Sequence, residues 1–240
     1  MKTSWKSWWV SQNGPRHIAM GVGNQDAAAG WKGCDELILT VADGVGACSH
    51  AAEGSSAAVA AVVSCGRKRS ARAGTIGEFA RSVADDWRRR VPPTVRADYG
   101  TTCLWCTMPR SGLARFGQVG DGVVAWGQHD GSVNALCWPW ERDGFQNETN
   151  SVESARSESD WLLAEVDVRL IRWVVCATDG ISDDLQPNAW KAFGERLARL
   201  SSEVSHRTCR ESFRKVLLDW PRPCHADDKS LAFVLLGEER

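Results

Sequence analysis

Three aspartates stand at the same kind of place in the sequence, each directly after an apolar, strand-like run and directly before a glycine: Asp43, Asp121 and Asp179. Because strand ends meet at the edge of a sheet, these carboxylates could face one pocket. Clustered carboxylates repel one another and lose hydration, and Mg²⁺ or Mn²⁺ relieves that cost because both ions prefer oxygen ligands. A single Asp-Gly dipeptide is an ordinary turn signal. Only the set of three predicts a divalent metal site.

The strands that must position these aspartates are predicted from short apolar or alternating runs between turn residues. They cover residues 37–42, 101–108, 113–119, 123–127, 168–178 and 230–236. A further hairpin is expected at His129-Asp130-Gly131. The polar, turn-rich stretch 141–160 is predicted to be a mobile surface loop.

Helices are predicted in two pairs, one early and one late in the chain. The first helix covers residues 52–65, and the second begins at a Thr75–Glu78 capping box and ends before Pro92. Asn188 is the expected N-cap of the third helix, and the fourth covers residues 203–220. Strand runs separated by helix pairs favour an α+β layered fold over a parallel βαβ sheet. Since no internal repeat or linker is evident, residues 1–240 are expected to form a single domain.

Short motifs follow one another along nearly the whole chain: GPRH at 14–17, NQDA at 24–27, VADGVG at 41–46, GTT at 100–102, VGDG at 119–122, ATDGISD at 177–183 and DDKS at 227–230. In this order they resemble the metal-dependent protein phosphatases of type 2C, especially the compact bacterial branch. The resemblance implies a four-layer αββα sandwich, in which a central antiparallel β-sandwich is flanked by helix pairs.

The resemblance also implies a metal centre of two Mn²⁺ or Mg²⁺ ions, with a possible weaker third. In the family pattern Asp43 bridges the two ions, and the carbonyl of Gly44 binds one of them. Asp179 binds the same pair, and Asp26 at the end of the opening motif helps to bind the centre.

The remaining metal positions implied by the resemblance lie in the later motifs. The closing family aspartate matches Asp227, although a shift by one residue to Asp228 is left open. Asp121 and Asp183 are expected at the weaker third ion.

The activity implied by the resemblance is hydrolysis of phosphoserine and phosphothreonine in proteins by a metal-activated water, with Asp43 and Asp179 as the catalytic carboxylates. The implied partners are a phosphorylated protein substrate and an opposing serine/threonine kinase. His17 lies in the first motif, and two roles remain open for it. It acts either as a general acid or phosphate contact, or as a histidine that only caps or packs.

Position 21 departs from the family pattern. Many members carry an arginine there, five residues before the first metal-binding aspartate, where it holds the substrate phosphate; this chain has Gly21. The departure favours a second hypothesis, a degenerate phosphatase-fold protein that binds a phosphoprotein or another partner without turnover. A hydrolase of small phosphoesters is a third, because the motifs specify phosphoryl chemistry and not the leaving group.

The bulk composition argues against several other classes of protein. A formal net charge of −1 gives no electrostatic attraction to nucleic acid or to a membrane surface. No apolar stretch is long enough for a transmembrane helix and the N-terminus lacks a signal-peptide pattern, so a cytoplasmic location with reduced cysteines is expected. Cys103 and Cys106 form a C-x-x-C, but a strand would place them on opposite faces, which argues against a zinc or redox site.

Overall fold

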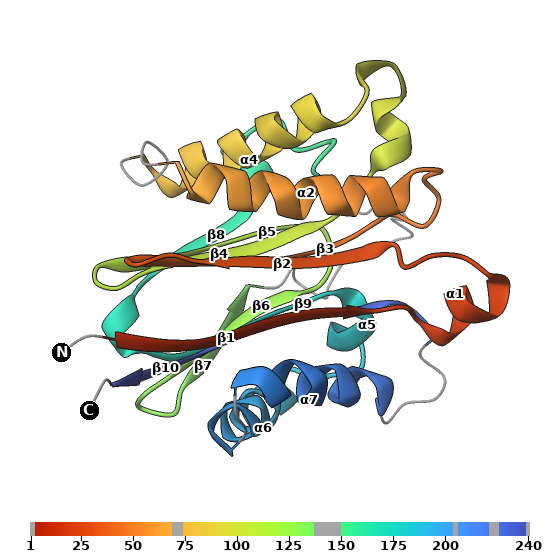
Figure 1. Cartoon of the computed structure of the whole chain (residues 1–240). Coiled ribbons are helices and arrows are strands. Elements are labelled where there is room, and N and C mark those ends of the chain that lie inside the picture. Colours follow the sequence, from red (N-terminus) through yellow and green to blue (C-terminus); the bar gives the residue numbers. More distant parts are fainter. Residues whose placement is uncertain (1–2, 69–73, 137–149, 204–205, 221–225, 239–240) are drawn as a thin grey trace.

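The computed structural model describes residues 3–68, 74–136, 150–203, 206–220 and 226–238. Within these ranges the chain forms two stacked β-sheets with helices on both outer faces (Figure 1). This arrangement of helices, sheet, sheet and helices confirms the expected αββα sandwich.

The two sheets have five strands each, and all neighbouring strands run antiparallel. The first sheet has the order β1-β10-β9-β6-β7 and comprises Thr3–Gln12 (β1), Lys229–Glu238 (β10), Ile171–Ala177 (β9), Val123–Gln128 (β6) and Val133–Leu136 (β7). The second sheet has the order β2-β3-β4-β5-β8 and comprises Asp26–Lys32 (β2), Glu36–Asp43 (β3), Cys103–Pro109 (β4), Leu113–Val119 (β5) and Leu162–Asp167 (β8).

Two long helices cover each outer face (Figure 1). The second sheet is covered by α2 (Ala51–Gly66) and α4 (Ile76–Arg90), and the first sheet by α6 (Ala189–Glu203) and α7 (His206–Leu218). Two short helices, α1 (Pro15–Met20) and α5 (Asp179–Ser182), lie at one end of the sandwich. Single 3₁₀ segments cover Pro93–Tyr99, Glu158–Asp160 and Val168–Leu170.

The hydrophobic core lies in three layers that match this architecture. One apolar cluster fills the space between the sheets, and one lies under each helix pair. β3 contributes to the cluster between the sheets through Leu39 and to the cluster under α2 and α4 through Ile38. Burial on both faces explains why its sequence is almost continuously apolar.

Most predicted elements are confirmed near their expected bounds. The Thr75–Glu78 capping box is present at the start of α4, and Gln128 to Ser132 form the turn of the β6–β7 hairpin. The prediction for residues 168–170 is wrong, since these residues form a 3₁₀ turn and β9 begins at Ile171. The Asp167 side chain accepts a hydrogen bond from the backbone N–H of Arg169, which stabilises the turn over an extended strand.

Residues 141–149 of the predicted surface loop lie outside the described residues. In the remainder of that loop, residues 156–159 are exposed, as expected of a surface segment, whereas two apolar side chains turn inward. Val152 and Ala155 are buried in the cluster under α2 and α4, and the Val152 N–H donates a hydrogen bond to the Thr101 carbonyl at 2.9 Å. These two side chains pack the first part of the segment against the second sheet.

The two cysteines of the C-x-x-C lie on opposite faces of β4, as predicted. Cys103 packs in the cluster under α2 and α4, whereas Cys106 packs between the sheets. Both are free thiols. None of the helices in the described ranges is long and apolar enough to cross a membrane.

Candidate metal site

The aspartates singled out in the sequence come together at one end of the sandwich, where α1 and α5 lie (Figure 1). Asp26 opens β2 and Asp43 closes β3, which runs in the opposite direction. Asp179 opens α5 two residues after β9 ends, and Asp227 lies two residues before β10 begins. Antiparallel order therefore brings strand starts and strand ends to the same edge.

Asp26 and Asp43 are direct cross-strand neighbours in the β2–β3 ladder. The adjacent pair is hydrogen-bonded, because the Gly44 N–H donates to the Gln25 carbonyl at 3.1 Å. Since hydrogen-bonded and non-hydrogen-bonded pairs alternate, Asp26 and Asp43 form a pair of the closer type, with their side chains on one face. Two carboxyl groups are thus held against each other by the backbone.

Thr178 connects this carboxyl pair to the other sheet. Its hydroxyl donates a hydrogen bond to Asp26 Oδ2 at 2.8 Å and accepts one from the backbone N–H of Ser230 at 3.0 Å. Thr178 is fully buried and Asp26 is only 7% exposed. The other oxygen, Asp26 Oδ1, is buried without a hydrogen-bond donor among the described residues.

The protein makes ionisation of this cluster unfavourable. Burial, opposed in part by hydrogen bonds from Asp43 and Thr178, raises the pKa of Asp26 to about 7. Burial, together with the charges of Asp26, Asp179 and Asp227, raises the pKa of Asp43 well above its usual range. Burial and the neighbouring charge of Asp227 raise the pKa of Asp179 to about 6. A bound cation would remove this repulsion.

Exposure of the carboxylates increases from the floor of the site to its rim. Asp26 is buried, Asp43 and Asp179 are half-buried, and the other three are exposed: Asp121, Asp183 and Asp227. All three exposed charges act on Asp179 and help to raise its pKa. The structure thus brings these six sequence-predicted aspartates to one region, with Asp121 and Asp183 on its outer side.

Glycines allow the close approaches that this region requires. A Cβ at Gly180 would lie 1.9 Å from the Asp228 carbonyl oxygen, and a Cβ at Gly44 would lie 2.4 Å from the Ala51 carbonyl oxygen. Asp121 sits between two glycines with positive φ, Gly120 at 84° and Gly122 at 112°. Each Asp-Gly dipeptide therefore has a steric reason in the fold.

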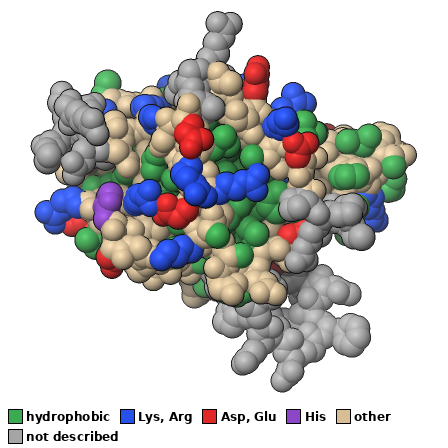
Figure 2. Space-filling view, turned by 90° about the horizontal axis from the view of Figure 1, so that it is seen from below, with side chains coloured by type: hydrophobic (Ala, Val, Ile, Leu, Met, Phe, Trp, Pro, Cys, Tyr) green, Lys and Arg blue, Asp and Glu red, His purple; other side chains and the backbone are tan. Residues whose placement is uncertain are grey.

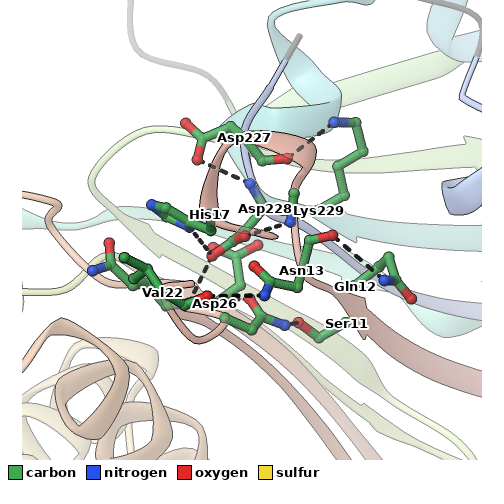
Figure 3. A network of polar contacts seen from close by, with 12 residues as sticks. Ser11, Gln12, Asn13, His17, Val22, Asp26, Asp227, Asp228 and Lys229 are labelled. Carbon is green, nitrogen blue, oxygen red and sulfur yellow. Dashed lines mark hydrogen bonds and ion pairs between the residues drawn. The ribbon is translucent and has the colours of Figure 1, made fainter. Parts of the chain in front are cut away.

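The carboxylate of Asp228, the alternative metal ligand to Asp227, has another set of partners (Figure 3). One oxygen accepts the Gly14 N–H at 2.6 Å, while the other accepts the Gln25 N–H at 2.6 Å and contacts His17 Nδ1 at 2.9 Å. Asp228 is 2% exposed. The Asp228 carboxylate therefore joins two segments, at Gly14 before α1 and at Gln25 before β2, to the segment that carries Asp227.

His17 lies beside this network on α1, with its Nδ1 held by Asp228 (Figure 3). Gly21 ends the same helix with a left-handed backbone, at φ 67°. An arginine at that position would be strained, so the glycine that replaces it has a structural reason. Position 21, at the end of α1, therefore supplies no guanidinium for the substrate phosphate.

Hydrated Mg²⁺ or Mn²⁺ fits these residues better than a metal enclosed by protein ligands. No three His, Cys, Asp or Glu side chains in the described part of the chain lie close enough together to enclose an ion. Mg²⁺ keeps several of its waters and is commonly held by one or two carboxylates, so a complete cage is unnecessary. The unsatisfied Asp26 oxygen and the raised carboxyl pKa values are the features that a hydrated cation would satisfy.

Two supporting residues were missed by the sequence analysis. Thr178 precedes the motif aspartate, but a threonine at a strand end carries no signal of a hydrogen bond to the opposite sheet. Lys229 is 5% exposed, and its ammonium donates a hydrogen bond to the Asp227 carbonyl at 3.1 Å. Burial lowers its pKa, while the neighbouring Asp184 and Asp227 act in the opposite direction. It places one positive charge behind the cluster.

The protein phosphatase 2C family profile matches residues 13–218 of this chain. No curated protein sequence matches the chain at a significant level. The profile match covers strands β2 to β9, both helix pairs and five of the aspartates described above; β1, β10 and Asp227 lie outside it.

Solved structures of bacterial phosphatases share the fold over nearly the whole chain. A bacterial serine phosphatase superposes with a TM-score of 0.69 at 14% identity, covering 99% of this chain and 100% of that one. Serine/threonine phosphatase Stp1 from Staphylococcus aureus gives 0.67 at 16% identity, covering 100% and 97%. The catalytic domain of PstP, solved in complex with two manganese ions, gives 0.65 at 13% identity, covering 98% and 100%.

Proposed function

The chain belongs to the protein phosphatase 2C family, and from this premise we propose that it hydrolyses phosphoserine and phosphothreonine in proteins with Mn²⁺ or Mg²⁺. The observation that carries the proposal is the Asp26–Asp43 pair, two facing carboxyl groups whose pKa values burial raises, beside Asp179 and Asp227. Such a cluster is unfavourable unless a cation neutralises it. A phosphorylated protein is the proposed substrate, and a serine/threonine kinase is the proposed opposing partner.

We assign the proposed centre to two ions with a weaker third. Asp43 and the Gly44 carbonyl lie where β3 ends, and Asp179 lies at the start of α5, close enough for its charge to act on Asp43, so these residues would hold the two ions. Asp26 supports Asp43 from the floor of the site, and Asp227 lies at the rim. Asp121 and Asp183 are the proposed residues of the third ion, because both are exposed on the outer side of Asp179.

Each part of the chain has a defined task in this proposal. Bound Mn²⁺ or Mg²⁺ supplies positive charge for the phosphoryl oxygens and makes a bound water acidic enough to act as the nucleophile. Asp43 and Asp179 would position the metal ions, and the Thr178 hydroxyl holds the Asp26 carboxylate in place through a hydrogen bond. No side-chain nucleophile is required.

His17 is the proposed contact for the substrate phosphate or leaving group. The Asp228 carboxylate accepts a hydrogen bond from the Nδ1–H of His17, which leaves Nε2 directed away from that bond. In the protonated ring, Nε2–H can donate a hydrogen bond to a phosphate oxygen or give its proton to the departing alkoxide, which leaves a neutral imidazole with its remaining proton on Nδ1. The site in this proposal therefore uses an imidazole where many relatives use the arginine that Gly21 replaces.

Asp227 is the better ligand candidate of the two adjacent aspartates, because both oxygens of Asp228 already have partners. Asp227→Asn is expected to weaken Mn²⁺ binding by about 100-fold, with little change in stability. Asp228→Asn is expected to lower the free energy of unfolding by about 1–3 kcal/mol, because an amide cannot accept all three donors. Calorimetric Mn²⁺ titration and urea unfolding of both variants separate the two roles. The reverse pattern would make Asp228 the ligand.

No thiol takes part in the proposed reaction. Cys103 is fully buried, and burial raises the pKa of its thiol to about 12, so it is not a thiolate at neutral pH. Cys103→Ala is therefore expected to retain kcat within about twofold while losing about 1 kcal/mol of stability from the small cavity. A loss of activity without unfolding in this variant would show that the reaction needs a thiol.

Hydrolysis of p-nitrophenyl phosphate as a function of Mn²⁺ concentration tests the proposal directly. We expect no activity in EDTA and saturable activation by Mn²⁺. Phosphopeptides should then be better substrates than nucleotides or sugar phosphates. A complete lack of activity at every Mn²⁺ concentration would instead support the second candidate, a phosphatase-fold protein that binds a phosphoprotein without turnover, which the glycine at position 21 favours.

A further inference from the structure

Helix α1 exposes large apolar side chains beside the carboxylate cluster. Ile18 is 59% exposed and Met20 is 62% exposed, the highest values among the large hydrophobic side chains that the structure describes. No residue of α1 is buried. Figure 2 shows hydrophobic side chains at the surface at the end of the molecule where α1 lies. These side chains add nothing to the core and are accessible to a binding partner.

The helix is nevertheless held firmly in one place. The Arg16 N–H donates to the Ala226 carbonyl at 3.0 Å, and His17 contacts Asp228 at 2.9 Å. The chain leaves α1 through a hydrogen bond from the Val22 N–H to the His17 carbonyl at 2.9 Å. Exposed apolar groups on an anchored element can bind a partner without first being ordered.

The start of α1 adjoins the rim of the metal site. A Cβ at Gly14, the residue before α1, would lie 2.3 Å from the Asp227 carbonyl, so the start of the helix touches the segment that bears this aspartate. An extended polypeptide advances about 3.3 Å per residue. Because α1 has six residues and is therefore about 9 Å long, three or four extended substrate residues span its length.

We infer that Ile18 and Met20 form an apolar subsite for a hydrophobic side chain flanking the phosphoserine or phosphothreonine of a substrate polypeptide. The inference rests on the proposed phosphatase function and specifies its substrate class. A hydrophobic flank would cover side chains that water now surrounds. An acidic flank would instead meet the exposed carboxylates of Asp121 and Asp183.

Two phosphoserine peptides that differ only in their flanking residues, leucine against glycine, test the subsite. Wild type is expected to show about tenfold higher kcat/KM for the leucine peptide, the effect of burying one aliphatic side chain in part. In the double variant Ile18→Ser/Met20→Ser the preference should fall to about twofold or less. Leu170→Ser is the matched control, because Leu170 is 51% exposed and precedes β9 at its other end; this variant should keep the full preference.

The outcomes separate the two levels of the proposal. Equal rates for both peptides in wild type, or an unchanged preference in the double variant, would overturn the apolar subsite and leave the phosphatase function standing. Hydrolysis of neither peptide, and no Mn²⁺-dependent hydrolysis of p-nitrophenyl phosphate, would overturn the phosphatase function itself. Circular dichroism checks that each variant is folded, as expected for exposed positions.

Discussion

Asp43→Asn is expected to lower kcat for p-nitrophenyl phosphate by at least about 10³-fold at saturating Mn²⁺. Asp43 faces Asp26 across the β2–β3 ladder, and its carboxyl also interacts with the charges of Asp179 and Asp227. Its carboxylate therefore lies where it could bind both of the two proposed metal ions. Asparagine keeps the size and one oxygen but removes the negative charge. Steady-state kinetics across a range of Mn²⁺ concentrations measure the loss.

The same variant is expected to be more stable than wild type when no metal is present. At pH 7.5 in EDTA, removing a half-buried carboxylate that three other carboxylates repel should raise the free energy of unfolding by about 1–3 kcal/mol. Urea unfolding measures this change. Loss of activity together with a gain in stability distinguishes a functional ligand from a residue that merely supports the fold.

Asp85→Asn is the matched control for this substitution. Asp85 lies on α4, and its 52% exposed side chain pairs with Arg88 at 3.1 Å. Exposed ion pairs of this type contribute about 0–1 kcal/mol, so activity and stability should both stay close to wild type. Retained activity in Asp43→Asn would refute the bridging role of Asp43.

The sequence predicts those elements well whose residues carry a local signal, such as an apolar run, a turn dipeptide or a helix cap. The apolar runs that end in Asp-Gly place Asp43 and Asp179 at strand ends, and antiparallel pairing then brings both to one edge. The capping box at Thr75 fixes the start of α4 for a local reason. Periodicity, turn residues and caps act over a few residues, so they can be read from the chain alone.

The N-terminal elements could not be predicted in the same way. β1 contains tryptophan, lysine and serine in an irregular pattern, and β2 is mostly alanine and glycine, so neither shows a clear period of two. Each is held as a strand by its ladder with β10 or β3. Tertiary pairing, and not local propensity, determines these two strands.

The supporting contacts of the site depend on distant pairs for the same reason. The Thr178 hydroxyl reaches Asp26 over 152 positions, and the Asp228 carboxylate reaches Gly14 over 214. A sequence motif shows which residue types are present, but it does not show which of two adjacent aspartates turns inward. In the structure Asp228 turns into the network with His17, while the Asp227 side chain points away from it (Figure 3).

The metal-free protein is expected to lose stability as the pH rises from about 4 to 7. Asp26 has a pKa of about 7 in the folded protein and an ordinary value of 3.8 when unfolded, so the folded state holds a proton that the unfolded chain has already released. Stability therefore falls with pH across this window. A single group with this difference contributes about 4 kcal/mol, and Asp26 and Asp43 titrate as a pair, so their effects do not simply add.

Mn²⁺ should reverse this trend, because metal and protons compete for the same carboxylates. Stabilisation by a bound ion grows with the ratio of free metal to Kd, and Kd falls as the carboxylates ionise. Urea unfolding at intervals between pH 4.5 and pH 7.5 is expected to give a falling free energy in EDTA and a rising one in Mn²⁺. The slope in EDTA should decrease in Asp26→Asn.

The chosen pH window isolates the site from the other perturbed carboxyl groups. Hydrogen bonds from Arg89 and Arg90 lower the pKa of Asp86, and the Ser157 N–H lowers that of Asp160. Groups with a lowered pKa lose their stabilising effect only as the pH falls below about 4, so they leave the range above it unchanged. A metal-free protein whose stability rises steadily from pH 4.5 to pH 7 would show that Asp26 and Asp43 ionise without hindrance, which would remove the electrostatic reason for a cation at this end of the sandwich.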